Sequence, residues 1–453
     1  MELPLDFIKQ TQAVLGEEWD DFLLSLQEEP LVSIRLNPKK EAKGILPYEL
    51  GAEQQVGWAK EGFYLEKRPK FTLDPLFHAG TYYVQEASSM YLGTIIREQV
   101  NVPSRVLDLC AAPGGKSTDL LGSLPEESLL VANEVIRSRA NILSENLIKW
   151  GYPNTIVTNN DPSAFKKLKY TFDVIVADVP CSGEGMFRKD PNAIREWSPG
   201  NVALCAERQR RIVADIWNSL AHNGLFVYST CTYNRQENED NINWICNELG
   251  AEIVVQPRRF FPHTSKGEGF FIAAVRKTYG KKEPLPPPSP QGEGASKKKK
   301  KESPSLVERD LGRGLLSTLH SSEDYTVFMR KNELTAFLKE YISDYQCIDK
   351  QLNILHAGIP LGEQKGKDIV PAHALAMSIA LNKDSFPRWE VDFPTALAYL
   401  RRESFHSLPD DLPTGYIILY YQNIPLGFVK NIGSRANNLY PQAWKINYSK
   451  FQI

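Results

Sequence analysis

Cysteine is sparse and irregularly placed in this chain of 453 residues. No two cysteines form a CxxC pair, and no regular spacing links the six of them, at positions 110, 181, 205, 231, 246 and 347. This pattern argues against a disulfide scaffold and against a zinc site of the usual spacing. We therefore expect reduced thiols, so that a reactive one is available, and no bound metal.

Long apolar runs are also missing. No stretch approaches the roughly 18 apolar residues that a membrane span requires. The first residues, MELPLDFIKQTQ, lack a basic segment followed by an apolar one. We predict a cytoplasmic protein without a membrane anchor, and we expect a monomer.

The net charge is only −2, but the charges are unevenly distributed. Residues 1–100 carry 10 basic and 16 acidic side chains, whereas residues 412–453 carry four basic and no acidic ones. A local basic surface of this kind is typical of proteins that bind nucleic acid.

Proline, small polar residues and lysine gather in residues 278–304, KTYGKKEPLPPPSPQGEGASKKKKKES. Such a composition cannot bury enough apolar surface to offset the entropy lost on ordering. We predict a disordered linker between two halves of a multi-domain protein. Its five consecutive lysines either contact nucleic acid or form a solvated tether.

Short apolar runs alternate with helical patterns between residues 101 and 277. The runs are RVLDLC, LLVANEV, TIVTNN, FDVIVADVP, GLFVYSTC, AEIVVQ and FFIAAVRK. We expect helices at 137–150, with Gly151 as the stop signal, at 202–220 and at 236–249. This order predicts an α/β fold whose mostly parallel sheet is covered on both faces, with the last two strands forming a hairpin at its edge.

The pattern outside this region is mixed. We predict an amphipathic helix over residues 5–26, a strand at VSIRLN and a helix that begins near Gln85. Residues 305–453 favour helices first and then strands at GYIILYY and PLGFVK, joined by a turn at QNIP.

The segment VLDLCAAPGGKST, residues 106–118, combines a strand, a turn of small residues and a helix start. Such a turn lets a ligand approach the backbone and the free amides of the helix. A P-loop is excluded because Cys110 stands where a glycine is required, six residues before Lys116, and GxGxxG is absent. Asp108 ends the strand, and Glu134 follows the next one, where a carboxylate can accept hydrogen bonds from a ribose. The loop suits an adenosyl ligand, with a simple packing turn as the alternative.

Four patterns follow one another between residues 30 and 277, namely YYVQEASSM, DLCAAPGGKST, ADVPCSGEG and YSTCTYNRQENED. Together they resemble the motifs of the RNA 5-methylcytosine methyltransferases that use S-adenosylmethionine, the RsmB/NOP2/NSUN family. In the second half, HAGIPLGEQKGKDIVPAHALA and PLGFVKNIGSRANNLYPQAWKI are similar to the bacterial RsmF-type members, which methylate 16S rRNA of the small ribosomal subunit.

The resemblance implies a Rossmann-like class I methyltransferase. Its mostly parallel sheet is expected to have seven strands, with an α+β N-terminal segment and a C-terminal α+β, PUA-like RNA-binding region. The expected domains are an N-terminal RNA-binding or lid domain over 1–100, a catalytic domain over 101–277, the linker over 278–304, an intermediate domain over 305–400 and a PUA-like domain over 401–453.

The resemblance also assigns the two thiols. Cytosine C5 accepts a methyl group only after a nucleophile has added to C6, and a thiolate both attacks and leaves well. In this family the attacking residue is the cysteine of the Thr-Cys motif, here Cys231, while Cys181 of the Pro-Cys motif aids release of the methylated base. Asp178 is expected to bind the base, and Lys116 either orients Asp178 or the base, or is solvated.

The predicted cofactor site lies around the glycine-rich turn. Arg139 either pairs with Glu134, contacts the cofactor or is solvated, and Asp161 is placed to receive the adenine amino group. The expected role of Cys110 is a backbone contact. The full predicted set for S-adenosylmethionine is Cys110, Ala111, Ala112, Pro113, Gly114, Gly115, Lys116, Glu134, Arg139, Asp161 and Asp178.

Cations and aromatic residues interleave near the C-terminus, which suits phosphate binding and base stacking. The alternative is a small β-domain whose aromatic residues form its core. The predicted RNA-binding residues are Lys430, Arg435, Tyr440, Trp444 and Lys445, accompanied by Tyr448, Lys450 and Phe451. Upstream, Gln85, Ser88 and Ser89 either bind RNA or cap a helix.

Two alternative functions stay open at this point. A tRNA cytosine-C5 methyltransferase would share every catalytic residue, and only the second half of the chain favours rRNA. A non-catalytic RNA-binding factor of ribosome assembly would retain the fold, although both thiols and Asp178 are present.

Overall fold

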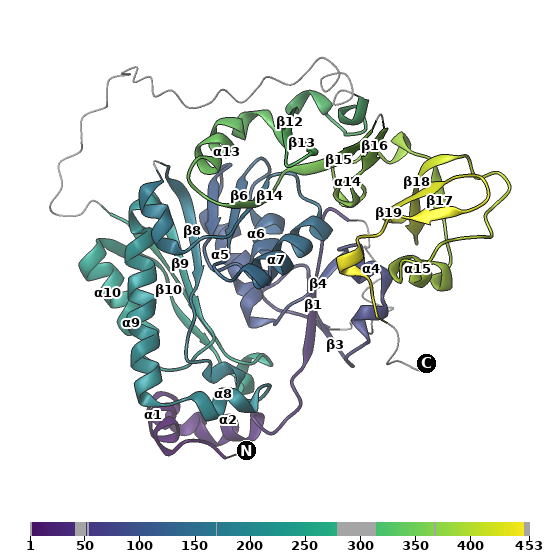
Figure 1. Ribbon diagram of the computed structural model, residues 1–453. Helices are drawn as coiled ribbons and strands as arrows, with labels where there is room; N and C mark the ends of the chain where they lie inside the picture. The colour runs from purple at the N-terminus through teal and green to yellow at the C-terminus, as the bar shows by residue number, and fades with distance from the viewer. Residues whose placement is uncertain are drawn as a thin grey trace, which may run out of the picture.

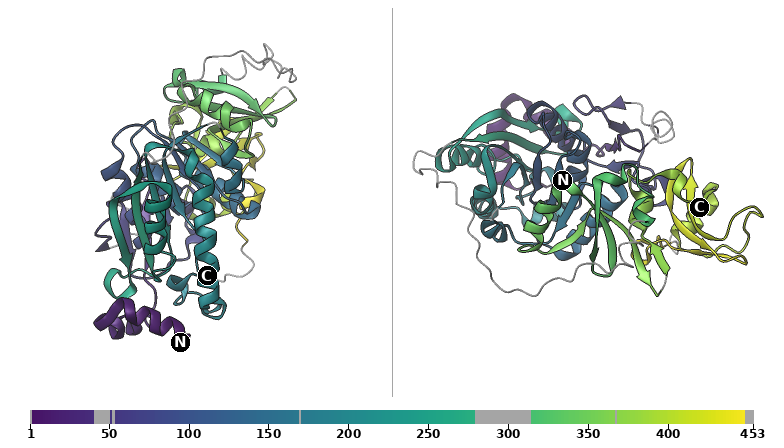
Figure 2. Two further views of the ribbon diagram at one scale, coloured as in Figure 1. Left: turned by 90° about the vertical axis from the view of Figure 1, so that its left-hand side faces the viewer. Right: turned by 90° about the horizontal axis from the view of Figure 1, so that it is seen from above.

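The computed structural model describes residues 2–40, 51, 54–168, 170–278, 314–366 and 368–447. This part of the chain contains four β-sheets. The N-terminal helices lie at one end of the molecule and the sheet of residues 325–371 at the other (Figures 1 and 2). The predicted linker lies outside the described residues, apart from residue 278.

The central sheet has eight strands in the order β10-β11-β9-β8-β5-β6-β7-β14. The five strands from β9 to β7 run parallel to one another, and the other three strands are added in antiparallel pairs. The strands are β5 (Arg105–Asp108), β6 (Leu129–Asn133), β7 (Thr155–Thr158), β8 (Phe172–Asp178), β9 (Leu220–Thr230), β10 (Ala251–Phe260), β11 (Phe270–Lys277) and β14 (Ile354–Ala357). The predicted Rossmann-like α/β fold is confirmed, together with the hairpin at the sheet's edge.

The eighth strand comes from the second half of the chain. The expectation of seven strands holds for residues 105–277, but β14 adds to them by pairing antiparallel with β7. Without β14, the edge of β7 would expose unpaired backbone amides and carbonyls. The second half is therefore joined to the first by backbone hydrogen bonds.

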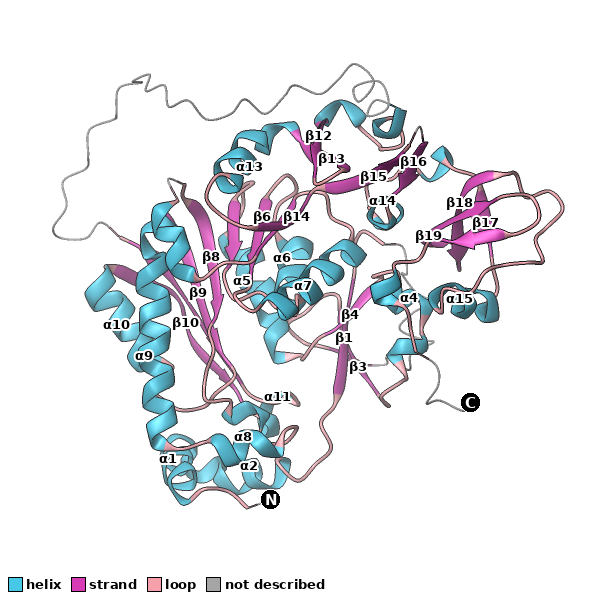
Figure 3. Ribbon diagram, in the orientation of Figure 1, coloured by secondary structure: helices cyan, strands magenta, loops and turns pink. Residues whose placement is uncertain are grey.

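Helices cover both faces of the central sheet (Figure 3). Val106 packs with residues of α5 (Tyr91–Gln99), α6 (Gly115–Ser123) and α7 (Arg137–Trp150). Its neighbour Leu107 packs with residues of α9 (Pro199–Ile216) and α10 (Glu239–Leu249). Because successive side chains of a strand point to opposite faces, these continuous apolar runs fill both layers.

The helix boundaries follow local signals. The predicted helix 137–150 is confirmed, and Gly151 ends it with a φ of +89°. The helix predicted at 202–220 begins at Pro199, because Ser198 caps it, and ends at Ile216. The helix predicted from residue 236 begins at Glu239.

The first hundred residues form a small sheet and two groups of helices. The single helix expected over 5–26 was wrong, because Gly16, with a φ of +56°, ends α1 (Leu5–Leu15) before α2 (Trp19–Ser25). The helix expected near Gln85 begins later, at Tyr91, after a short 3-10 turn. The antiparallel sheet has the order β2-β3-β1-β4, with β1 (Val32–Leu36), β2 (Gln54–Gln55), β3 (Gly62–Leu65) and β4 (Tyr82–Val84).

After residue 313 helices and strands alternate, so the expected order of helices first and then strands holds only for the short helical turn of residues 314–316 and for η7 (Ser322–Asp324), which precede the first strand. Lys331 and Asn332 both have a positive φ and form the two-residue turn of a hairpin, a signal that the apolar periodicity does not carry. The sheet is β12 (Tyr325–Arg330), β13 (Glu333–Leu338), β15 (Ile359–Lys365) and β16 (Asp368–Pro371), with helices α13 (Ile342–Asp349) and α14 (His373–Met377).

The C-terminal sheet begins ahead of the expected boundary at 401. Strand β17 (Arg388–Glu390) pairs in parallel with β18 (Gly415–Tyr421), and helix α15 (Phe393–Leu400) connects them. Gln422 and Asn423 have a positive φ, which confirms the predicted turn into β19 (Ile424–Asn431). The sheet closes with β20 (Ala436–Asn438).

The shorter helical segments are η1 (Gly16–Glu18), η2 (Phe71–Leu73), α4 (Pro75–His78), η3 (Ser88–Met90), η4 (Pro162–Lys167), η5 (Glu184–Met186), α8 (Pro191–Glu196), η6 (Trp217–Ser219), α11 (Pro262–Ser265), η7 (Ser322–Asp324), η8 (Lys339–Tyr341), η9 (Lys383–Ser385) and η10 (Gln442–Trp444).

Candidate active site

The predicted site residues gather where the parallel strands end. Strand β5 ends at Asp108, β8 ends at Asp178, and β9 ends at Thr230, directly before Cys231. Because parallel strands present their carboxyl ends at one edge of the sheet, loops far apart in the sequence meet there. We call this the carboxyl edge.

The glycine-rich turn of residues 109–115 connects β5 to α6. Gly114 takes a φ of +117°, a conformation that side-chain-bearing residues rarely adopt, and α6 begins at the next residue. Burial raises the pKa of the Cys110 thiol, which argues against thiol chemistry at this position.

Asp108 lies beneath this turn with no exposed surface. Its Oδ2 accepts a hydrogen bond from Ser117 Oγ at 2.6 Å, whereas Oδ1 is buried without a hydrogen-bond partner. Burial raises the pKa of Asp108 to about 7. A buried acceptor left without a donor is costly and calls for an explanation, and a ligand's donor provides one.

Glu134 lies buried at the end of β6. Its carboxylate accepts from the Ile136 amide at 2.8 Å and lies 3.4 Å from Arg139 Nη1, so the predicted pairing with Arg139 is confirmed. Arg139 also donates to the Ala112 carbonyl of the glycine-rich turn at 2.9 Å. Val135 and Ile136 beside it are 54% and 49% exposed, and they add an apolar surface that sequence reasoning missed.

Asp161 lies three residues after β7 and is exposed. Its Oδ1 accepts from the amide and hydroxyl of Ser163 at 2.9 and 2.6 Å, and these bonds lower the pKa of the carboxyl. Asp161 therefore caps the following 3-10 helix, and its role toward an adenine stays a prediction.

The two expected thiols lie side by side. The sulfurs of Cys181 and Cys231 are 3.0 Å apart, and the Cys231 amide donates to Cys181 Sγ at 3.3 Å. The hydrogen bond with Cys231, burial, and the charges of Cys231 and Glu237 all raise the pKa of Cys181 well above its usual range. Cys181 is therefore held as a neutral thiol.

Lys116 and Asp178 connect the glycine-rich turn to the thiols. Lys116 Nζ lies 2.8 Å from Asp178 Oδ2, and Ser229 Oγ donates to Asp178 Oδ1 at 2.8 Å. Burial lowers the pKa of Lys116, but the charge of Asp178 and the hydrogen bond to it, together with the charge of Asp108, outweigh burial, and the net pKa is raised. Lys116 is thus largely buried and paired with Asp178, which favours the first alternative over a solvated lysine, and its role in orienting Asp178 stays a prediction.

The N-terminal sheet contributes side chains beneath the same turn. Gln85 and Ser89 are buried and hydrogen-bonded to each other, and Arg35 of β1 donates to Gln85 Oε1 at 2.8 Å. Arg35 also donates to Thr118 Oγ1 of α6 at 2.7 Å. These contacts favour the structural alternative for Gln85 and Ser89, and they make Arg35 a link that sequence reasoning missed.

The predicted RNA-binding residues divide into two groups. Tyr440 is only 1% exposed and packs in the core against Tyr399, so its prediction as a stacking surface was wrong. Trp444 is half-buried against His373. Arg435 and Lys445 are exposed, and Lys430 lies over the Tyr416 ring. The predicted residues 448, 450 and 451 lie outside the described residues.

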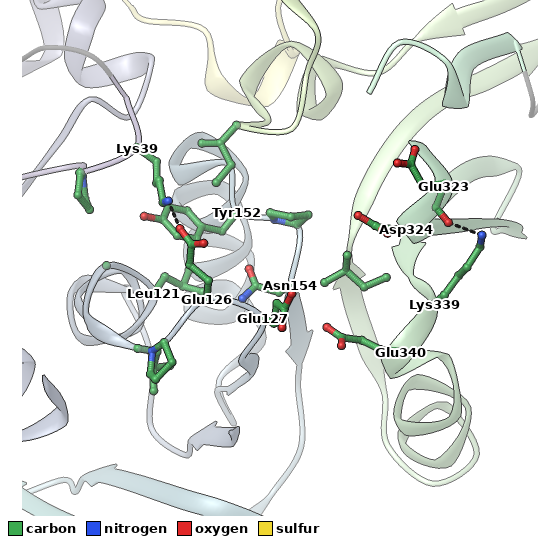
Figure 4. A pocket seen from close by; sticks show the side chains of 17 residues that line it. Lys39, Leu121, Glu126, Glu127, Tyr152, Asn154, Glu323, Asp324, Lys339 and Glu340 are labelled. Atoms are coloured by element: carbon green, nitrogen blue, oxygen red, sulfur yellow. Dashed lines mark hydrogen bonds and ion pairs between the residues drawn. The ribbon is translucent and has the colours of Figure 1, made fainter. Parts of the chain in front are cut away.

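A separate cavity of about 600 Å³ lies at the opposite end of the sheet. It is lined by residues that directly precede β6 and β7, and by residues of the second half, including Asp324 and Glu340 (Figure 4). Because the amino ends of the strands point away from the carboxyl edge, this cavity is not part of the thiol site.

The described residues contain neither a membrane-spanning helix nor a group of metal-ligating side chains. Within these ranges no helix is both long and apolar enough to cross a bilayer. In the same ranges no three His, Cys, Asp or Glu side chains are grouped to hold a metal ion.

Comparisons with known proteins agree with this geometry. The family model described as 16S rRNA methyltransferase RsmB/F matches residues 98–276, the N-terminal domain of 16S rRNA methyltransferase RsmF matches 3–87, and the methyltransferase RsmF PUA domain matches 386–446.

Two relatives that match nearly the whole chain have the same name. Ribosomal RNA small subunit methyltransferase F of Serratia proteamaculans is 30% identical over 97% of this chain and 96% of that protein. The protein of the same name from Cronobacter sakazakii is 31% identical over 97% of this chain and 95% of that protein.

Solved structures share the fold of about three fifths of this chain. A methyltransferase homolog protein from Pyrococcus horikoshii has a TM-score of 0.53 at 28% identity, covering 60% of this chain and 94% of that chain. NSun6 from Pyrococcus horikoshii with SFG has a TM-score of 0.54 at 21% identity, covering 61% of this chain and 99% of that chain.

Proposed function

Because the chain belongs to the family of 16S rRNA methyltransferases RsmB/F, we propose that it methylates C5 of a cytidine in the 16S rRNA of the small ribosomal subunit. We propose S-adenosylmethionine as the methyl donor, and a monomer acting in the cytoplasm. The observation that carries the proposal is the pair of sulfurs 3.0 Å apart at the ends of two neighbouring strands.

The residues of the glycine-rich turn fit an adenosyl ligand. Asp108 offers a buried acceptor without a donor, and Glu134 offers a carboxylate at the end of the next strand. Val135 and Ile136 offer exposed apolar surface of the kind that a flat base covers. S-adenosylmethionine supplies the methyl group when it is bound.

The two thiols have separate roles in the proposed reaction. The Cys231 thiolate attacks C6 of the cytosine and forms an S–C6 bond, while the electrons of the C5–C6 double bond make C5 nucleophilic. After C5 has accepted the methyl group, a solvent base removes the C5 proton, the S–C6 bond breaks, and Cys231 leaves as a thiolate. Cys181, a neutral thiol whose sulfur lies 3.0 Å from that of Cys231, assists by donating a hydrogen bond to the departing thiolate.

Asp178 and Lys116 stabilise the base during this addition. Charge develops on the cytosine ring when the thiolate adds, and a preorganised ion pair aimed at that charge lowers the barrier. Asp178 accepts a hydrogen bond from the amino group or shares a proton with N3. Its orientation is maintained by Lys116 and Ser229.

The target base must leave its stack to reach the thiols, because a base inside a helix is inaccessible to them. The exposed cations Arg435 and Lys445 of the C-terminal sheet support rRNA as the partner, through contacts with phosphates. The half-buried Lys430 and Trp444 are retained in the proposed RNA surface, and Tyr440 is removed from it.

Transfer of tritiated methyl groups from S-adenosylmethionine tests the proposal. The substrates are intact 30S subunits, 16S rRNA stripped of its proteins, and tRNA in parallel reactions. We expect incorporation into the small-subunit substrates, and bisulfite mapping then identifies the cytidine. Preference for tRNA contradicts the ribosomal substrate, and no transfer to any of the three contradicts an enzymatic function.

A further inference from the structure

Two buried glutamates lie between the loops that carry the thiols. We define the Cys181 loop as residues 179–187 and the Cys231 loop as residues 231–238. Glu184 belongs to the first loop and Glu237 to the second, and they are 2% and 0% exposed. Sequence reasoning assigned neither of them a role.

Glu184 binds the backbone of the opposite loop. Its Oε2 accepts from the Tyr233 amide at 2.7 Å, from the Asn234 amide at 2.8 Å and from Thr232 Oγ1 at 2.6 Å. Its Oε1 accepts from Trp197 Nε1 at 2.9 Å and from Asn234 Nδ2 at 3.1 Å. Five donors converge on one carboxylate, so both of its oxygens act as acceptors.

Glu237 makes the reciprocal contact. Its Oε2 accepts from the amide of Ser182, directly after Cys181, at 3.0 Å, and from Gln209 Nε2 at 2.7 Å. Its Oε1 accepts from Asn234 Nδ2 at 2.7 Å. Burial raises the pKa of Glu237, and the hydrogen bonds from Ser182 and Asn234 oppose this rise.

Two arginines near the thiol loops, Arg188 and Arg259, pair with glutamates other than Glu184 and Glu237. Arg188 pairs with Glu268 at 2.8 Å, and Arg259 pairs with Glu239. Hydrogen bonds from the two thiol loops therefore compensate the burial of Glu184 and Glu237. A buried carboxylate in such surroundings is stable only while its donors remain in place.

The two sulfurs lie between the loops that Glu184 and Glu237 connect by these hydrogen bonds. We call this set of hydrogen bonds the frame of Glu184 and Glu237. The Gly185 amide donates to the Cys231 carbonyl at 2.9 Å, and the Cys231 amide donates to Cys181 Sγ. A side chain at Gly185 would lie 2.7 Å from the Gly269 carbonyl and 3.0 Å from that of Cys231. The two loops thus approach as closely as their backbones allow.

We propose that Glu184 and Glu237 are positioning residues that together set the distance between the two thiols. Each carboxylate binds amides or side chains of the loop that does not carry it, so displacement of either one releases both loops. For catalysis, this inference rests on the proposed function. The geometric claim concerns the free protein and needs neither cofactor nor RNA.

Phenylarsine oxide tests the distance directly. Arsenic bonds to both sulfurs of a close thiol pair, and the arsenical oxygen leaves as water with the two thiol protons. We expect the wild-type protein to bind one equivalent across Cys181 and Cys231, as measured by intact mass and peptide mapping. We expect Glu184→Gln and Glu237→Gln to lower the affinity at least tenfold.

The matched control is Glu239→Gln, because Glu239 lies two residues after Glu237 but pairs with Arg259 of β10. It should bind the arsenical like the wild-type protein. If Glu184→Gln does not fold, Thr232→Val removes one donor to Glu184 from a buried side chain of similar shape. Folded variants of both glutamates that retain wild-type affinity would overturn the inference, as would wild-type affinity in a folded Thr232→Val.

Kinetics separate positioning from general damage to the fold. We expect the glutamate variants to lower kcat while KM for S-adenosylmethionine stays unchanged, because the glycine-rich turn belongs to other strands. A rise of the KM for S-adenosylmethionine by the same factor as the fall in kcat would contradict a role confined to the thiols. A protein whose thiols bridge as expected but that transfers no methyl group refutes the proposed function and leaves the positioning role intact.

Discussion

The two halves of the carboxyl edge differ in how well their buried carboxylates are satisfied. In the thiol half, at the ends of β8 and β9, Glu184 and Glu237 are surrounded by donors. In the cofactor half, at the end of β5, Asp108 leaves one buried oxygen without a partner. The thiol half is thus preorganised by the protein's own donors, whereas the cofactor half retains one buried acceptor that has no donor within the protein.

Replacing the nucleophile tests the thiol half most severely. We expect Cys231→Ala to lower methyl transfer at least about 10³-fold, because no covalent addition to C6 can occur. The same variant should form no adduct with RNA that contains 5-fluorocytidine or 5-azacytidine, as measured on denaturing gels. Cys205→Ala, buried in α9, is the matched control and should retain both signals. An adduct in Cys231→Ala that is absent in Cys181→Ala would reverse the two roles.

Removing the second thiol should separate addition from release. We expect Cys181→Ala to slow turnover about 10²-fold while a covalent complex with unmodified rRNA accumulates, because elimination loses its assisting group. The complex is measured as protein that migrates with RNA in denaturant. The double variant Cys181→Ala/Cys231→Ala should form no covalent complex. If Cys181→Ala alone also formed none, the role of Cys181 in product release would be contradicted.

Lys116 belongs to α6, next to the glycine-rich turn of the cofactor half, and its side chain pairs with Asp178 of the thiol half. We therefore expect its loss to change the geometry of both halves. We expect Lys116→Met to lower kcat about 10-fold to 10²-fold, because Asp178 loses the cation that orients it. Lys166→Met, an exposed lysine paired with Asp215, serves as the control. A variant with wild-type kcat would show that Ser229 alone is sufficient to hold Asp178.

The unsatisfied Asp108 should make stability depend on pH. Its folded pKa of about 7 lies above the ordinary value of 3.8, so the unfolded chain loses this proton first as pH rises. The free energy of unfolding should therefore fall between about pH 4 and pH 7, by up to about 4 kcal/mol from this group.

Urea unfolding of wild-type protein and Asp108→Asn at pH 5 and pH 7, without cofactor, measures this difference. We expect a smaller loss between the two pH values in the variant, because its side chain does not titrate. Equal losses in the two proteins would show that Asp108 does not titrate in this range.

The smallest change that we expect is in the affinity for rRNA, on removal of a cation from the C-terminal sheet. We expect Arg435→Ala to weaken rRNA binding about threefold and to reduce the slope of log affinity against log salt by about one, since one phosphate contact is lost. Ser434→Ala, its exposed neutral neighbour, should change neither quantity. An unchanged salt dependence in Arg435→Ala would remove this residue from the RNA surface.

The sequence by itself determined the parallel sheet and the meeting of the two thiols. Runs of Val, Ile and Leu can be buried on both faces only in such a sheet, and parallel strands bring their ends to one edge. Gly151 marked the end of its helix for a local reason, because it takes a left-handed conformation there. These features depend on a few neighbouring residues, which is why a pattern reveals them.

Only the tertiary structure decided which partners the buried groups find. Apolar periodicity indicates that Tyr440 can be buried, but not that Tyr399 lies beside it and removes it from the RNA surface. The pairing of β14 with β7, the frame of Glu184 and Glu237, and the unpartnered oxygen of Asp108 have the same origin. Each depends on segments far apart in the chain, whose distance in space is set by the packing of the whole fold.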